Sequence, residues 1–192
     1  MDINFDVNLD VNKVFQKRLA ASMGLDKYQF IMEQVNQTDV STDPKFQRTF
    51  NDFCRINGKR NEAWQKVYYE YFQNVKDGTP TFESILTYLY EHTKNIEPSF
   101  SSKMLATISR DKPKPIWDKY VLQNLNMKLV GTTKEKRLAN AIKLYADLEK
   151  WYADFLQTDK AKEWIEAFDR AMPDYKDISD IKKIDFILWI IR

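Results

Sequence analysis

The sequence contains few of the residues that turn-rich folds require. Only 4 glycines and 6 prolines occur among 192 residues. A β-sandwich or β-barrel needs many tight turns, and tight turns favour Gly, Pro and Asn. Long helices need few such residues, so the composition favours an all-α protein. The length predicts a single domain, residues 1–192, with a division into two helical lobes as the alternative.

Cysteine and histidine are nearly absent, because Cys54 and His92 are the only ones. A single cysteine excludes an intramolecular disulfide and Cys-based zinc or iron–sulfur clusters, and it fits a reducing, cytoplasmic compartment. A single histidine excludes the HExxH zinc motif, and four scattered glycines exclude a glycine-rich phosphate loop. We therefore expect no metal and no cofactor. We expect Cys54 to be buried and inert, and His92 to be exposed.

Targeting and membrane-spanning segments are also missing from the sequence pattern. Asp2, Asp6 and Asp10 stand where a signal peptide carries positive charge. The longest apolar run, residues 186–191, is far shorter than the ~20 residues that a membrane span requires. We expect a cytoplasmic protein without a membrane partner.

Apolar residues recur with helical spacing along the chain. The clearest stripe runs from Trp64 to Val75, with apolar residues at i, i+3, i+4, i+7, i+8 and i+11. At this spacing its aromatic rings are predicted to form core rather than a base-stacking surface. The whole pattern predicts a compact array of about ten helices, near residues 12–23, 26–34, 44–56, 64–75, 82–90, 99–108, 115–125, 133–155, 160–172 and 179–191.

Charge is distributed unevenly, although the formal net charge is only +2. Residues 103–143 contain ten Lys or Arg and three acids, which gives +7 and leaves −5 for the rest of the chain. Such an asymmetry is typical of a polyanion-binding face. The alternative is an ordinary lysine-rich, solvated surface.

Two charged residues near the start of this segment stand in unusual positions. Lys103 lies at the edge of the apolar stripe of the predicted helix 99–108, where partial desolvation makes a lysine more nucleophilic. Asp118 lies in the first turn of the helix that Pro115 is predicted to open, where the helix dipole stabilises a carboxylate. The structural alternative is a snorkelling lysine and a good first-turn residue. No carboxylate is expected to stand alone in an apolar setting.

The order of these residues resembles a known enzyme family. Lys103, an apolar helix, a proline-containing loop, the Pro-x-x-Asp sequence of residues 115–118 and a Val/Leu helix follow one another. This order is similar to the core of the helix-hairpin-helix DNA glycosylase superfamily, particularly its OGG-like (8-oxoguanine-glycosylase-like) members. The resemblance covers about residues 99–125. Pro98-Ser99-Phe100-Ser101 stands where the hairpin of the family carries Gly-x-Gly.

The resemblance implies an all-α enzyme that binds double-stranded DNA and flips a damaged base into a pocket. Lys103 then corresponds to the lysine that attacks the sugar carbon, and Asp118 to its assisting aspartate. Ser101 and Ser102 fall where the hairpin meets a phosphate. The further phosphate contacts are expected from the basic residues Lys112, Lys114, Lys119 and Arg137.

Three functional hypotheses follow from the sequence. The first is a base-excision DNA glycosylase or AP lyase that forms a Schiff base through Lys103. The second is a non-catalytic helical protein that binds nucleic acid or another protein through the same basic face. The third is a helical scaffold with no role in nucleic-acid binding. The sequence predicts neither the oligomeric state nor the substrate base.

Overall fold

The computed structural model describes residues 10–12, 15, 24–56 and 60–191. These residues form nine α-helices and one short 3-10 helix, and none of them is in a β-strand, which confirms the all-α class. The chain divides into two compact units, residues 22–112 (the first unit) and residues 1–21 with 113–192 (the second unit). The predicted helix 12–23 lies largely outside the described residues.

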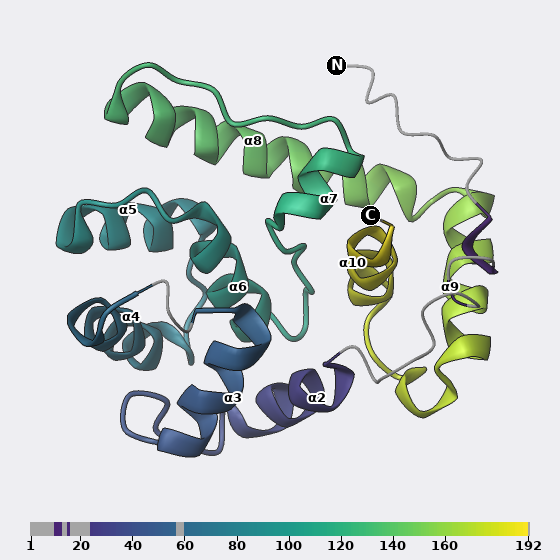
Figure 1. Ribbon diagram of the computed structural model, residues 1–192, viewed down its shortest axis with the longest axis horizontal. Coiled ribbons are helices and arrows are strands. Elements are labelled where there is room, and N and C mark those ends of the chain that lie inside the picture. Colours follow the sequence, from purple (N-terminus) through teal and green to yellow (C-terminus); the bar gives the residue numbers. More distant parts are fainter. Residues whose placement is uncertain (1–9, 13–14, 16–23, 57–59, 192) are drawn as a thin grey trace. The chain divides into compact units, whose positions relative to one another are not determined.

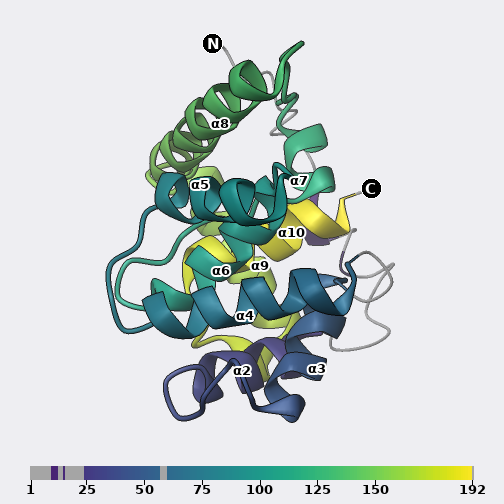
Figure 2. The same ribbon diagram turned by 90° about the vertical axis from the view of Figure 1, so that its left-hand side faces the viewer.

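The first unit contains helices α2 to α6. Helix α4 lies between α5 on one side and the pair α2–α3 on the other (Figures 1 and 2). The caps follow the sequence: the Asp43 carboxylate accepts hydrogen bonds from the main-chain N–H groups of Lys45 and Phe46 at the start of α3. The bounds are α2 (Leu25–Gln34), α3 (Pro44–Cys54), α4 (Glu62–Val75), α5 (Phe82–Thr93) and α6 (Pro98–Ile108).

An aromatic cluster forms the core of this unit. Phe50 is fully buried, and four aromatic rings from α3 and α4 lie within 5.6–6.1 Å of its ring centroid: Phe46, Tyr68, Tyr69 and Phe72. The stripe predicted on residues 64–75 therefore faces the core. Cys54 is buried and His92 is exposed, as expected.

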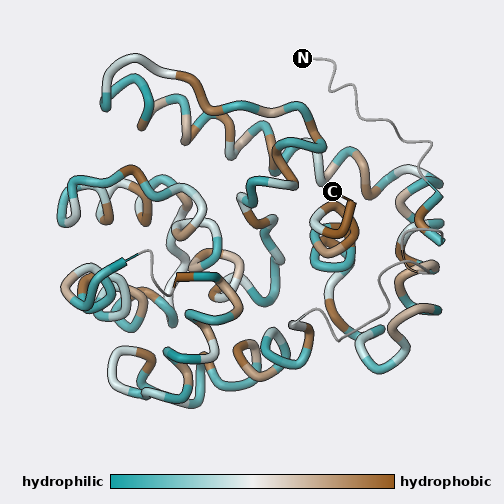
Figure 3. The backbone as a smooth tube through the Cα atoms, viewed as in Figure 1, coloured by the Kyte–Doolittle hydropathy of each residue, from teal (hydrophilic) through white to brown (hydrophobic). Residues whose placement is uncertain are grey.

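The second unit is built around its last helix. Helix α10 contacts both α7 and α9, and Asn124 of α7 donates to the main-chain oxygens of Leu188 and Ile191 at 2.6 and 2.7 Å. Figure 3 colours much of α10 as hydrophobic, in agreement with its burial. The bounds are α7 (Lys119–Asn124), α8 (Lys134–Phe155), α9 (Asp159–Ala171), the 3-10 helix η1 (Pro173–Tyr175) and α10 (Asp180–Ile190).

One predicted helix start is wrong. Pro115 does not open a helix, because α7 begins only at Lys119. The residue before a proline avoids the helical region, which favours an extended chain at Lys114. The main-chain N–H of Ile116 donates to the Asp185 carboxylate at 3.2 Å, and residues 115–118 are not helical. Asp118 consequently occupies the N-cap of α7 rather than its first turn.

Candidate functional site

Lys103 lies on α6 with its side chain half-buried. Its amine donates a hydrogen bond of 2.9 Å to the main-chain oxygen of Cys54, the last residue of α3. The C-terminal end of a helix carries unpaired carbonyl oxygens and partial negative charge, so a lysine is favoured there. The amine also lies 5.3 Å from the ring centroid of Phe100, one turn earlier on α6. The neighbours of the amine are thus a neutral oxygen and an aromatic ring.

A second cation approaches the same aromatic ring. The Arg60 guanidinium lies 5.3 Å from the ring centroid of Phe100 and forms two hydrogen bonds of 2.7 Å with the Glu97 carboxylate. Burial raises the pKa of Glu97, and Arg60 opposes the shift. Glu97 is the residue before α6, and Pro98 occupies the first position of the helix, where a proline loses no hydrogen bond. This ion pair therefore fixes the start of the helix that carries Lys103.

Asp118 has a local structural partner in the second unit. Its Oδ1 accepts a hydrogen bond of 2.8 Å from the main-chain N–H of Tyr120, and the side chain is half-buried. This contact caps α7. Lys103 and Asp118 belong to different units, and their convergence in one site stays a prediction.

The two serines of the predicted hairpin are buried. The Ser101 hydroxyl donates to the main-chain oxygen of Glu97 at 2.9 Å, and the Ser102 hydroxyl to that of Ser99 at 3.0 Å. Both bonds lie within the first turns of α6. In this conformation neither hydroxyl faces solvent.

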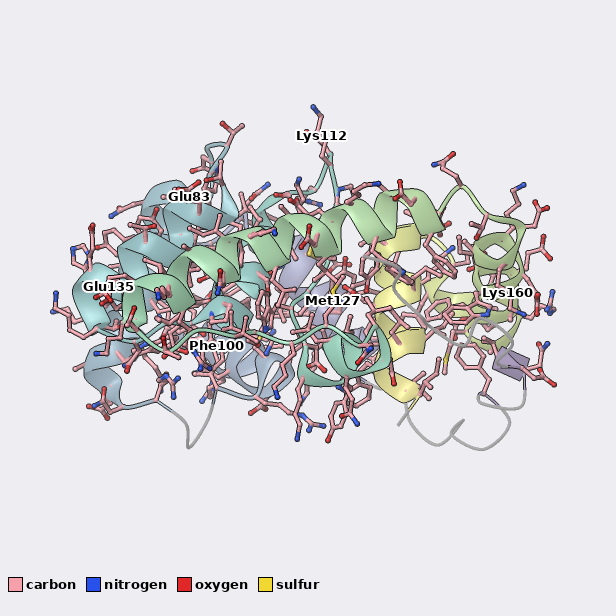
Figure 4. All side chains as sticks on the ribbon, turned by 90° about the horizontal axis from the view of Figure 1, so that it is seen from above. Glu83, Phe100, Lys112, Met127, Glu135 and Lys160 are labelled. Atoms are coloured by element: carbon pink, nitrogen blue, oxygen red, sulfur yellow. The ribbon has the colours of Figure 1, made fainter. Side chains whose placement is uncertain are left out.

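The four predicted phosphate-binding residues differ in their environments. Lys112 is exposed (Figure 4). Lys114 forms an ion pair of 2.6 Å with Glu149 of α8. Lys119 is exposed, with its amine 5.7 Å from the ring centroid of Tyr120, and Arg137 is exposed on the first turns of α8. Three of the four side chains therefore face solvent, and Lys114 is the one engaged with an acid.

The segment before α8 folds back along that helix. Residues 126–133 run beside the first turns of α8 in both views (Figures 1 and 4). The Asn140 side chain donates to the main-chain oxygen of Val130 at 3.0 Å. Gly131 has a φ of +143°, and a Cβ atom added there would lie 2.8 Å from the Cα and N atoms of Arg137. The turn into α8 is therefore closely apposed to the helix.

Replacing Gly131 with alanine is expected to loosen this turn. The added methyl group meets the Arg137 backbone in a conformation that L residues avoid, at a cost of about 1–3 kcal/mol. Urea unfolding and amide hydrogen exchange over residues 134–140 measure the effect. Gly78→Ala is the matched control, because a Cβ there would meet only the main-chain oxygen of Val75, at 3.5 Å. Equal protection of these amides in the parent and in Gly131→Ala would contradict the prediction.

A buried acidic residue, which the sequence analysis missed, lies in the second unit. Asp185 of α10 accepts from the hydroxyl of Tyr152 and from the main-chain N–H of Ile116, and its Oδ2 lies 3.7 Å from the Lys182 amine. Burial raises the pKa of Asp185 to about 6; Lys182 lowers it and the charge of Asp118 adds to the rise. The sequence predicted no carboxylate in an apolar setting of this kind, and the buried Asp185 corrects that expectation. The feature of the sequence that could have indicated its burial is the position of Asp185 between the apolar residues Ile184 and Phe186.

The described residues contain no group of three or more His, Cys, Asp or Glu side chains placed to bind a metal ion. Within the described part of the chain, no helix combines the length and the apolar character that crossing a bilayer requires. No protein-family model, no curated protein and no solved structure matches the chain.

Proposed function

We propose that this protein binds double-stranded DNA and acts as a DNA glycosylase or AP lyase, with Lys103 as nucleophile and Asp118 as its electrostatic partner. The observation that supports the proposal is the environment of the Lys103 amine. It is half-buried and hydrogen-bonded to a neutral carbonyl oxygen rather than to a carboxylate. The resemblance of residues 99–125 to the glycosylase family points to the same pair of residues.

The partner of a lysine matters because only the neutral amine is a nucleophile. A carboxylate stabilises the protonated ammonium, whose nitrogen has no free electron pair. The buried lysines of the second unit are in that situation: Lys182 lies 3.7 Å from Asp185, and Lys183 lies 2.8 Å from Asp169. Lys103 differs from both in its acceptor, which is a main-chain oxygen rather than a carboxylate.

The chemical step joins the amine to the sugar of a damaged nucleotide. The neutral Lys103 nitrogen forms a bond to C1′, and the bond from C1′ to the base breaks with its electron pair leaving on the base, which takes a proton from water. The C1′–O4′ bond then breaks with its pair on O4′, which receives the proton that the amine loses. The product is a protonated Schiff base between C1′ and Lys103. Positive charge develops on the sugar during this step, and the Asp118 carboxylate stabilises it electrostatically.

Borohydride trapping tests the proposal. Reduction of the Schiff base is expected to give a covalent adduct between the protein and a duplex that contains an abasic site or an oxidised guanine. Lys103→Ala is expected to abolish the adduct. Asp118→Asn, which preserves a good N-cap, is expected to slow its formation by roughly 10²–10³-fold. Absence of an adduct for the parent protein on every damaged duplex would refute the enzyme proposal.

Lys76 provides the matched control for loss of a structural lysine. Its amine is buried and donates to the main-chain oxygens of Val35 and Thr38, at 3.2 and 2.6 Å. Lys76→Ala therefore removes a lysine that caps carbonyl oxygens in the same unit, as Lys103 does. Adduct formation is expected to survive in Lys76→Ala at temperatures where that variant is folded. An adduct that persists in Lys103→Ala would assign the nucleophile to another amine.

A second candidate function is non-catalytic binding of nucleic acid through the basic residues. The exposure of Lys112, Lys119 and Arg137 favours it. Duplex binding that weakens steeply with salt, without any borohydride adduct, would support this candidate over the enzyme. If the protein does not bind DNA even at low salt, the third hypothesis remains, a helical scaffold with no role in nucleic-acid binding.

A further inference from the structure

Residues 128–143, here called the basic arm, carry a concentrated positive charge. Five of them are Lys or Arg (Lys128, Lys134, Lys136, Arg137 and Lys143), and Glu135 is the single acid, so the arm sums to +4. All five cations are exposed. The arm consists of the turn at Gly131 and the first turns of α8 (Figure 4, where Glu135 marks the start of α8).

Glu135, the single acid of the arm, forms hydrogen bonds at the start of its own helix. Hydrogen bonds from its own main-chain N–H and from the Thr133 hydroxyl lower the pKa of Glu135. These bonds keep its carboxylate at the helix start, where negative charge is favoured. Within the described part of the chain, no ion pair engages Lys136, Arg137 or Lys143. The positive charge of these three residues is therefore available to a ligand.

The exposed face of α8 places lysines at regular intervals. Residues 136, 143 and 150 are lysines and residues 139, 146 and 153 are alanines, and all six are exposed. Seven residues correspond to a rise of about 10.5 Å along a helix, and residues seven apart lie on nearly the same face. Lys150 is paired with Asp154 at 2.5 Å, so the unpaired part of this row is Lys136 and Lys143. Small alanine side chains between lysines allow a rod-like ligand to approach the helix closely.

We infer that the basic arm is a surface that contacts the phosphate backbone of duplex nucleic acid, independently of base sequence. The inference rests on the part of the proposed function that makes duplex DNA the ligand, and not on the chemistry of Lys103. Charge complementarity supports this ligand, because a duplex presents a regular array of phosphates to which lysines bind with release of counterions.

The composition of the arm favours a phosphate backbone over other anionic partners. A single-strand surface needs exposed aromatic rings on which bases stack, and the arm contains no aromatic residue. A membrane-surface helix needs bulky apolar side chains, whereas Val130, which is 58% exposed, is the one exposed large apolar side chain of the described residues. Protein interfaces rely on buried Trp, Tyr and Arg anchors, and Arg137 is the only such residue in the arm.

The salt dependence of duplex binding tests the inference. The parent protein and the double variant Lys136→Ala/Lys143→Ala are titrated with an undamaged duplex between 50 and 200 mM salt. Each lysine–phosphate contact contributes about 0.9 to the slope of log K against log salt. The double variant is therefore expected to show a slope shallower by about 1.8 and weaker binding at every salt concentration. The melting temperature is expected to be unchanged, because both side chains are exposed.

The control variant removes two charges outside the arm. Lys66 and Lys176 are exposed on α4 and after η1, and Lys66→Ala/Lys176→Ala changes the net charge by the same amount. It is expected to retain the parent slope. A slope that falls equally in both variants would overturn the inference in favour of a general charge effect. The inference would also be overturned if the arm variant showed the same slope as the parent protein.

Borohydride trapping of the same variants separates this inference from the enzyme proposal. An adduct in the parent, together with an unaffected slope in the arm variant, would refute phosphate binding by the basic arm and leave the enzyme proposal standing. A reduced slope without any adduct would support the arm and refute the catalytic role of Lys103. Loss of binding to anionic vesicles in the arm variant, with duplex binding unchanged, would instead assign the arm to a membrane surface.

Discussion

Phe50→Ala is expected to lower the free energy of unfolding of the first unit by about 3–5 kcal/mol. Phe50 is fully buried and its ring lies within 5.6–6.1 Å of four other aromatic rings. Truncation removes the apolar surface of one ring and leaves a cavity that rigid aromatic neighbours fill poorly. Urea unfolding, followed by tyrosine and tryptophan fluorescence, measures the loss.

Two variants show whether the loss comes from the cavity. Phe50→Leu retains most of the buried volume and is expected to cost roughly half as much or less. Phe53→Ala removes a ring at the half-buried edge of the same helix, where part of the side chain already contacts water, and is expected to cost less than Phe50→Ala. Equal losses for Phe50→Ala and Phe53→Ala would show that Phe50 does not occupy the centre of the core.

The helices could be predicted because their signals are local. Asp43-Pro44 and Ser179 each place a capping side chain directly before an apolar stripe, and the structure uses both as N-caps. The stripe of residues 64–75 predicted both a helix and the face that it buries. The start of α7 could not be read in the same way. Proline is a common first residue of helices. Here, however, the main-chain N–H of the next residue, Ile116, donates to a carboxylate 69 residues away.

The candidate site was less predictable than the helices. The position of Lys103 at the edge of an apolar stripe predicted its half-burial. Its partner, the oxygen of Cys54, is 49 residues away and is a main-chain atom that leaves no trace in residue identity. The buried Glu97 was missed for a similar reason, because its partner Arg60 lies 37 residues earlier. Contacts between distant segments depend on packing, which periodicity does not encode.

The burial of Asp185 was not predicted, because the apolar residues around it in α10 dominate the sequence pattern. The residues around it in the sequence are apolar, and most residues of α10 are buried. The polar residues of the same helix, Lys182, Lys183 and Asp185, are buried with it. They are accommodated because α8 supplies the Tyr152 hydroxyl and α9 supplies Asp169. A buried polar group without such partners would cost several kcal/mol.

The raised pKa of Asp185 predicts a specific pH dependence of stability. In the folded protein the carboxyl group keeps its proton up to about pH 6, whereas in the unfolded chain it loses the proton near the ordinary value of 3.8. Between these values the folded state binds more protons, so stability falls as the pH rises through this window. A difference of 2.2 pH units corresponds to a loss on the order of 3 kcal/mol, at 1.36 kcal/mol per unit.

Asp185→Asn is expected to remove this loss, because an amide does not ionise. Its single oxygen can accept from only one of the two donors, Tyr152 or Ile116, and the cost of the lost hydrogen bond does not vary with pH. Relative to the parent, the variant is expected to gain about 3 kcal/mol in free energy of unfolding between pH 4 and pH 8. Urea unfolding of both proteins across this range measures the difference, in which the titration of all other groups cancels. Asp174→Asn, at an exposed acid of the same unit, is the control and is expected to follow the parent. A constant difference between the parent and Asp185→Asn from pH 4 to pH 8 would show that the carboxyl group titrates as an ordinary aspartate, and that the groups around it in α7, α8 and α10 balance the cost of its burial.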